Sequence, residues 1–135
     1  MDSLQQHDPM GYVHQTHIIK GVGHWMNRVD SAAVPWMQQF RRNPYPKQIV
    51  WRQAEVVKPY FYWLGAPQQE LAPGKMVRAS IHGNQVDITA CDYSSLTIYL
   101  NDDLVDLDKA ITIKYGKRLL FRGRVRRKES TMRQT

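Results

Sequence analysis

The sequence predicts a mainly β protein: a small antiparallel β-sandwich of about seven strands, preceded by a strand, a loop and a helix. From Lys47 onward, short runs rich in β-branched and aromatic residues alternate with turn signals. The pairs Gly83-Asn84 and Gly116-Lys117 have the two-residue length that tight hairpins prefer. Before Lys47 the pattern differs, because one strand-like run and one helix-like run are joined by a glycine-rich turn.

The first expected element is a strand over residues 12–20, whose side chains alternate between two faces, neither cleanly apolar. A strand of this kind is typical of a larger sheet that is covered on both sides. Gly21 and Gly23 then allow a sharp turn. This turn places His24 at the C-terminal end of the strand.

The second expected element is a helix over residues 32–42. Asp30 or Ser31 is a suitable N-cap, since both side chains accept hydrogen bonds from free helix amides. The proline at Pro44 then ends the helix. Together the two elements form a strand-loop-helix segment.

Strands are expected near 48–53, 60–65, 76–82, 85–91, 95–100, 111–115 and 118–125. Short strands with regular turns indicate a small sandwich or barrel. The residues after Arg127 lack apolar content and are expected to form a disordered basic tail.

Composition limits the function classes. No apolar run approaches the ~18 residues of a transmembrane helix. The first residues have neither the basic start nor the apolar stretch of a signal peptide. The single cysteine, Cys91, excludes an internal disulfide and an all-cysteine zinc site. The formal net charge is +7, and basic residues crowd the last part of the chain.

Three motifs carry a family resemblance. They are Gly-His-Trp-Met at 23–26, Pro-Trp-Met at 35–37 and Arg-Asn-Pro at 42–44. With them, residues 12–44 resemble the C-terminal end of a bacterial α/β-hydrolase of the prolyl-oligopeptidase-like or depolymerase-like serine esterase group. Residues 47–64 resemble the start of a small β domain that follows the hydrolase core in some members.

The resemblance implies three regions: residues 1–46 are the last strand, histidine loop and last helix of the hydrolase core, 47–127 are an accessory β-sandwich, and 128–135 are the tail. His24 is then the triad base. The serine and the acid precede the histidine in this fold's usual order, and the sequence contains no Gly-x-Ser-x-Gly motif. The resemblance therefore implies a serine hydrolase fragment that is inactive alone and needs no metal or cofactor.

The same resemblance implies partners and a compartment. The parent hydrolyses ester or peptide bonds and is periplasmic or secreted. Its partners are the remainder of the hydrolase core or a second copy of the chain, because the segment before Lys47 is expected to expose apolar surface when alone. Another interpretation of the chain is a purely structural assembly domain that forms an oligomer.

A binding module is the alternative from a different class. An aromatic-rich pair of strands either stacks on sugar rings or fills a core, and we favour the core; its residues are Trp51, Tyr60, Phe61, Tyr62 and Trp63. The basic C-terminal residues Arg124, Arg126 and Arg127 either bind an anionic polymer or form a solvated edge, and we favour the edge.

Two sets of residues invite a metal interpretation. His14 and His17 point to opposite faces of the expected strand, so they cannot chelate one ion together with His24. The acidic run Asp102, Asp103, Asp106 and Asp108 lacks the spacing of a calcium loop. We therefore expect no metal site.

Overall fold

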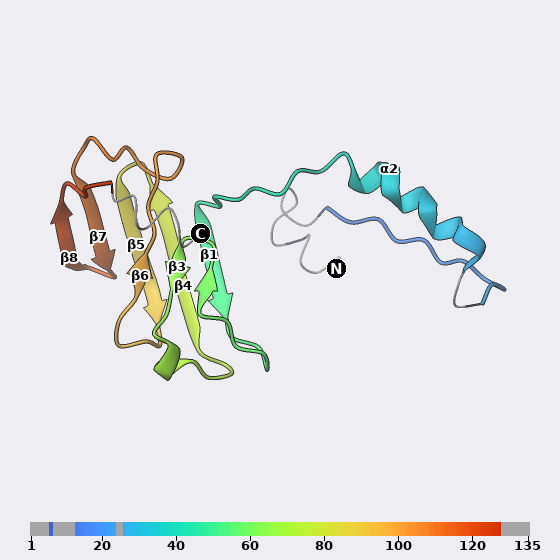
Figure 1. Ribbon diagram of the computed structural model, residues 1–135, viewed down its shortest axis with the longest axis horizontal. Coiled ribbons are helices and arrows are strands. Elements are labelled where there is room, and N and C mark those ends of the chain that lie inside the picture. Colours follow the sequence, from blue (N-terminus) through green and yellow to red (C-terminus); the bar gives the residue numbers. More distant parts are fainter. Residues whose placement is uncertain (1–5, 7–12, 24–25, 128–135) are drawn as a thin grey trace. The chain divides into compact units, whose positions relative to one another are not determined.

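A computed structural model describes residues 6, 13–23 and 26–127 of the chain. The protein is mainly β, with a short helical stretch followed by eight strands in two sheets. The chain divides into two compact units, Met1–Arg42 and Asn43–Thr135 (Figure 1). We call them the N-terminal unit and the β unit. No helix of the described residues is long and apolar enough to span a membrane.

The larger sheet has five strands in the order β1-β4-β5-β7-β8 (Figure 1). The strands are β1 (Gln48–Arg52), β4 (Met76–His82), β5 (Gln85–Cys91), β7 (Ile111–Tyr115) and β8 (Arg118–Gly123). Neighbouring strands are antiparallel except β5 and β7, which are parallel. The sheet is therefore mixed.

The smaller sheet has three antiparallel strands in the order β2-β3-β6. They are β2 (Tyr60–Phe61), β3 (Leu64–Gly65) and β6 (Thr97–Ile98). A single 3₁₀ turn, η2 (Gln68–Glu70), follows β3. Because β6 belongs to this sheet, the chain leaves the larger sheet after β5 and returns to it at β7.

Both sheets contribute to a single core. Alternate residues of β1 and β4 are buried; in β1, Ile49 and Trp51 are buried and their neighbours are exposed. Trp63 and Leu64 come from the smaller sheet. The connection before β7 adds three more buried side chains, which are Leu104, Val105 and Leu107. No described residue of the N-terminal unit belongs to this core.

Most predicted strands of the β unit are confirmed, including 76–82, 85–91 and 111–115. Two predictions are wrong. An all-antiparallel arrangement is contradicted by the parallel pairing of β5 and β7. The strand expected at 60–65 is two strands, since Tyr62 adopts a positive φ of 54° and turns the chain between β2 and β3.

The N-terminal unit departs furthest from the prediction. Residues 13–20 form no strand, because no neighbouring strand among the described residues accepts their hydrogen bonds. Helical structure begins early, as the 3₁₀ helix η1 (Met26–Ala32), and continues as α2 (Ala33–Met37). The predicted helix bounds of 32–42 and the predicted caps Asp30 and Ser31 are therefore wrong, since both residues lie inside η1.

Candidate functional sites

His24, the predicted triad base, lies outside the described residues. The turn predicted before it begins at Gly21, whose φ of 75° is one that glycine adopts readily. The expected tail, residues 128–135, also lies outside the described part of the chain. The role of His24 stays a prediction from the sequence.

The two histidines weighed as metal ligands, His14 and His17, do not lie on a strand, so the argument from opposite strand faces no longer applies to them. Over the described ranges, no three His, Cys, Asp or Glu side chains lie close enough together to hold a metal ion.

The acidic run is a loop held by other protein groups. Lys47 donates from Nζ to the carbonyl oxygens of Asp103 and Leu104, at 2.7 and 2.5 Å. The guanidinium of Arg127 donates to Asp102 and Asp108, with nitrogen–oxygen distances of 2.7 and 2.8 Å. Carboxylate oxygens of Asp102 and Asp108 and the carbonyl oxygens of Asp103 and Leu104 are therefore bound to cationic side chains.

Asn84 attaches the same loop to the β4–β5 hairpin. Its Nδ2 donates to the carbonyl oxygens of Asp106 and Ala110, at 2.7 and 3.3 Å. Its Oδ1 accepts from the backbone nitrogen of Asp106 at 2.9 Å. Three hydrogen bonds from one side chain thus fix the loop that leads into β7.

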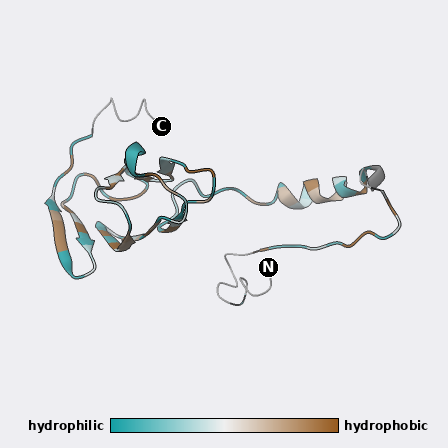
Figure 2. Ribbon diagram, turned by 90° about the horizontal axis from the view of Figure 1, so that it is seen from below, coloured by the Kyte–Doolittle hydropathy of each residue, from teal (hydrophilic) through white to brown (hydrophobic). Residues whose placement is uncertain are grey.

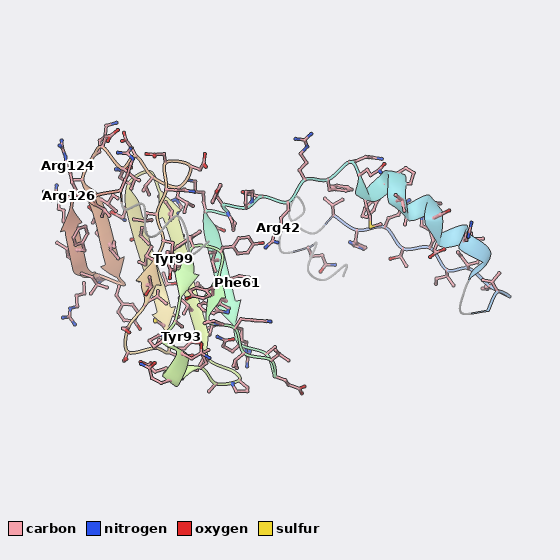
Figure 3. All side chains as sticks on the ribbon, viewed as in Figure 1. Arg42, Phe61, Tyr93, Tyr99, Arg124 and Arg126 are labelled. Atoms are coloured by element: carbon pink, nitrogen blue, oxygen red, sulfur yellow. The ribbon has the colours of Figure 1, made fainter. Side chains whose placement is uncertain are left out.

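The basic end of the chain divides into two kinds of arginine. Hydrogen bonds to Asp108 and Asp102 raise the pKa of Arg127. The hydrogen bond from Arg127 lowers the pKa of Asp108. Arg124 and Arg126, which Figure 3 labels, are exposed. With Asp108 and Arg127 they line an open hollow of about 640 Å³. Arg127 is therefore a structural residue, while Arg124 and Arg126 remain candidates for binding an anion.

Among the described residues of the β unit, Ser94 is a candidate for serine chemistry. Its backbone nitrogen donates to the Glu70 carboxylate at 2.8 Å, and its hydroxyl donates to the other carboxylate oxygen. Both bonds lower the pKa of Glu70, and the bond from the hydroxyl has the larger effect. The contact holds the loop after β5 in place. Among the described hydrogen bonds, none joins the Ser94 hydroxyl to a histidine that would activate it.

The aromatic strands are partly core and partly surface. Trp51 and Trp63 are buried, and the Trp63 indole donates to the carbonyl oxygen of Pro46 at 2.7 Å. Tyr60, Phe61 and Tyr62 are exposed, with Tyr60 showing 59% of its surface. The predicted core role is confirmed for the two tryptophans and wrong for Tyr60, Phe61 and Tyr62.

A pair of tyrosine rings lies at the smaller sheet: Tyr60 of β2 is exposed, and Tyr99, which directly follows β6, is half-buried. The rings of Tyr60 and Tyr99 are 6.0 Å apart at 59°, and both approach Gly65. A Cβ at Gly65 would meet the Tyr99 ring at 3.1 Å and the Tyr60 ring at 3.3 Å. Burial, followed by the neighbouring Tyr60, raises the pKa of Tyr99, which Figure 3 labels. The glycine is what lets the two rings lie over the strand.

Comparison of the chain with protein-family models, curated proteins and solved structures finds no match. Function is therefore argued from the residues themselves. Sequence reasoning missed Tyr99 and Gly65, because their partners come from different strands, and it missed the anchoring role of Asn84, which the turn motif alone does not reveal.

Proposed function

We propose that residues 1–46 supply the last strand, histidine loop and last helix of a serine hydrolase core, and that residues 47–127 are its accessory β-sandwich. The observation that carries the proposal is the unburied apolar surface of the N-terminal unit. Helix α2 has no buried residue. Ile18 exposes 83% of its surface in a segment whose composition suits a strand.

A hydrolase sheet would complete this segment. The strands of such sheets are buried on both faces, so residues 12–20 would gain hydrogen-bond partners and cover for Ile18 and Ile19 together. Val34 and Met37 of α2 and Phe40 after it, all exposed, would pack on the same core. One additional layer would thus cover these three side chains together with Ile18 and Ile19.

In that setting His24 acts as general base and then as general acid. It takes the proton of the serine hydroxyl as the serine attacks an ester or peptide carbonyl, and returns it to the leaving group. The serine and acid would come from the rest of the core. Since the three residues act as a unit, the chain alone should not turn over an ester.

A serine-directed fluorophosphonate probe and a generic nitrophenyl ester test the proposal. The reading frame upstream of Met1 is sequenced, and the longer product is made with and without His24→Ala. We expect an in-frame Gly-x-Ser-x-Gly motif, labelling of the longer product, and hydrolysis that His24→Ala reduces about 10⁴-fold or more. Turnover by this chain that His24→Ala abolishes would contradict inactivity alone, and an upstream frame without a serine motif would end the proposal.

The exposed N-terminal unit also predicts self-association. Without a hydrolase core, a second copy is expected to cover Ile18 and its neighbours. Light scattering after size exclusion should show a dimer or larger species that Ile18→Ser dissociates. A compact monomer would count against an uncovered N-terminal unit.

A second candidate function is a polysaccharide-binding module, which the pairing of the exposed Tyr60 with the half-buried Tyr99 favours. Tyrosine rings offer an apolar face and a polar tip, the two features that stacking on a sugar needs. Retention on insoluble cellulose, chitin or xylan should be lost in Tyr60→Ala and kept in Tyr45→Ala, an exposed tyrosine outside the smaller sheet. Retention on heparin that depends on Arg124 and Arg126 would instead indicate an anionic polymer.

A further inference from the structure

One edge of the larger sheet differs from the other. Strand β8 is last in the sheet order and, among the described strands, pairs with β7 alone. The opposite edge strand, β1, has Ile49 and Trp51 buried. In β8 the five residues from Arg118 to Arg122 are all exposed. A strand exposed on both faces is an open template for another strand.

The centre of β8 is apolar. Leu119, Leu120 and Phe121 expose 53%, 50% and 39% of their surfaces. In Figure 2 the outermost strand is brown at its centre and teal at its ends. Three consecutive exposed apolar residues on a sheet edge mark a site of association rather than a solvated edge.

A hollow beside the strand continues this apolar surface into the core. Its volume is about 300 Å³, and its lining includes Leu120, Tyr115 and the core residues Ile88 and Tyr93. Leu120 lies at the irregularity where the β7–β8 register shifts. A cavity of about 150 Å³ accommodates a benzene ring, so this hollow has room for an apolar side chain from outside.

The charge along the segment of β8 itself is of one sign. No Asp or Glu occurs between Gly116 and Arg127, while exposed cations lie at both ends of the apolar centre; they are Lys117, Arg118, Arg122, Arg124 and Arg126. Among the described ion pairs, those of this segment involve Arg127 only. The occupant of the edge is therefore expected to carry negative charge.

A second copy fits this edge poorly. An antiparallel pair of β8 strands centred on Leu120 would place Arg118 of each copy opposite Arg122 of the other, and like charges directly opposite are destabilising. A nucleic acid or sulfated polymer would satisfy the arginines but leave Leu119, Leu120 and Phe121 in water. An extended peptide that carries both acidic and apolar residues satisfies both sets.

We propose that β8 binds such an acidic, extended peptide segment as an added strand of the larger sheet, with one apolar side chain in the hollow beside Leu120. The backbone of β8 supplies hydrogen bonds and the flanking arginines select the charge, as in other cases of strand addition. This surface belongs to the β unit and does not depend on His24 or on a hydrolase core.

The test uses a fluorescent decapeptide composed of Glu and Val, and the same peptide with Lys in place of Glu. Anisotropy should show binding of the Glu peptide alone. Leu120→Ser should weaken it about tenfold, and Arg118→Gln with Arg122→Gln should weaken it and flatten its salt dependence. Val50→Ser is the matched control, since Val50 is an exposed apolar residue on the other edge strand. It should bind as the unchanged protein does.

Hydrogen exchange adds a readout that charge alone would not change: the amides of β8 should become protected when the Glu peptide binds. The proposal would be overturned if the Lys peptide bound equally well, if the Glu peptide did not bind, or if β8 gained no protection. It would also be overturned if heparin displaced the peptide and bound the Leu120→Ser variant as well as the unchanged protein. A dimer that Leu120→Ser dissociates would also overturn it, whereas one that only Ile18→Ser dissociates concerns the N-terminal unit.

Discussion

The two units use the same residue types with opposite results. Ile18 in the N-terminal unit is 83% exposed, whereas Ile111 in the β unit has no exposed surface. Both lie in runs with strand-like composition. What differs is a second layer: Ile111 belongs to a core that both sheets form, and no described residue of the N-terminal unit is buried.

The difference shows that a segment forms a strand only where a neighbouring strand pairs with it. The Ile111–Tyr115 segment forms β7 because β5 and β8 accept its hydrogen bonds on both sides. Residues 13–20 have no such neighbours in the described chain and stay without regular structure. The N-terminal unit is thus the part whose structure a partner would change most.

The largest expected effect tests this difference directly. Ile111→Ala should lower the free energy of unfolding by about 3 kcal/mol, since it leaves a cavity in the core. The matched change Ile18→Ala should alter it by less than about 0.5 kcal/mol. Urea denaturation followed by tryptophan fluorescence reports on the core through Trp51 and Trp63. Equal losses for the two variants would mean that Ile18 is buried in the folded chain.

Sequence patterns predicted the local elements of the β unit well. The strands 76–82 and 85–91 combine alternating burial with the Gly83-Asn84 turn between them, so composition and connection agree. The parallel pairing of β5 and β7 was not predictable in this way, because it depends on a long connection through the smaller sheet. The strand expected at 12–20 had the composition but not the partner.

The sites followed the same rule. The buried tryptophans could be expected from aromatic content. The pairing of Tyr60 with Tyr99 over Gly65 could not, since three strands bring these residues together. The exposure of the centre of β8 could likewise not be predicted, because Leu119, Leu120 and Phe121 have the composition of core residues.

The next largest effect is expected at Asn84, which anchors the loop that leads into β7. Asn84→Ala removes three hydrogen bonds to residues 106 and 110, and should cost about 2 kcal/mol of unfolding free energy. Asn43→Ala removes one turn hydrogen bond, to the Tyr45 nitrogen, and should cost about 0.5 kcal/mol. Chemical denaturation of both variants measures the difference. Similar small losses would show that β7 does not need this anchor.

A smaller effect is expected at the glycines. Gly65→Ala pushes a Cβ against two tyrosine rings and should cost about 1 kcal/mol. Gly23→Ala has open space around its Cβ and should leave β-unit stability within about 0.5 kcal/mol of the unchanged value. Thermal or urea denaturation compares them. No loss in Gly65→Ala would mean that the Tyr60 and Tyr99 rings move apart freely.

The smallest effect is electrostatic and depends on pH. Because the Arg127 guanidinium lowers the pKa of Asp108 below its ordinary value of 3.8, the pair stabilises the folded chain at neutral pH. That contribution is complete above about pH 5 and is lost as the pH falls through the lowered pKa of Asp108. Arg127→Gln should therefore lower the urea midpoint slightly at pH 7 and converge with the unchanged protein near pH 2.

The neighbouring Arg126→Gln is the control, since Arg126 is exposed and takes part in none of the ion pairs found among residues 6, 13–23 and 26–127. Its midpoint should follow the unchanged protein at both pH values. A difference at pH 7 as large as that of Arg127→Gln would mean that general charge repulsion among the arginines, and not the contacts with Asp102 and Asp108, sets the stability of this end of the sheet. In that case the single-sign charge along the β8 segment would itself destabilise the β unit, and an acidic strand bound there would stabilise it by neutralising that charge.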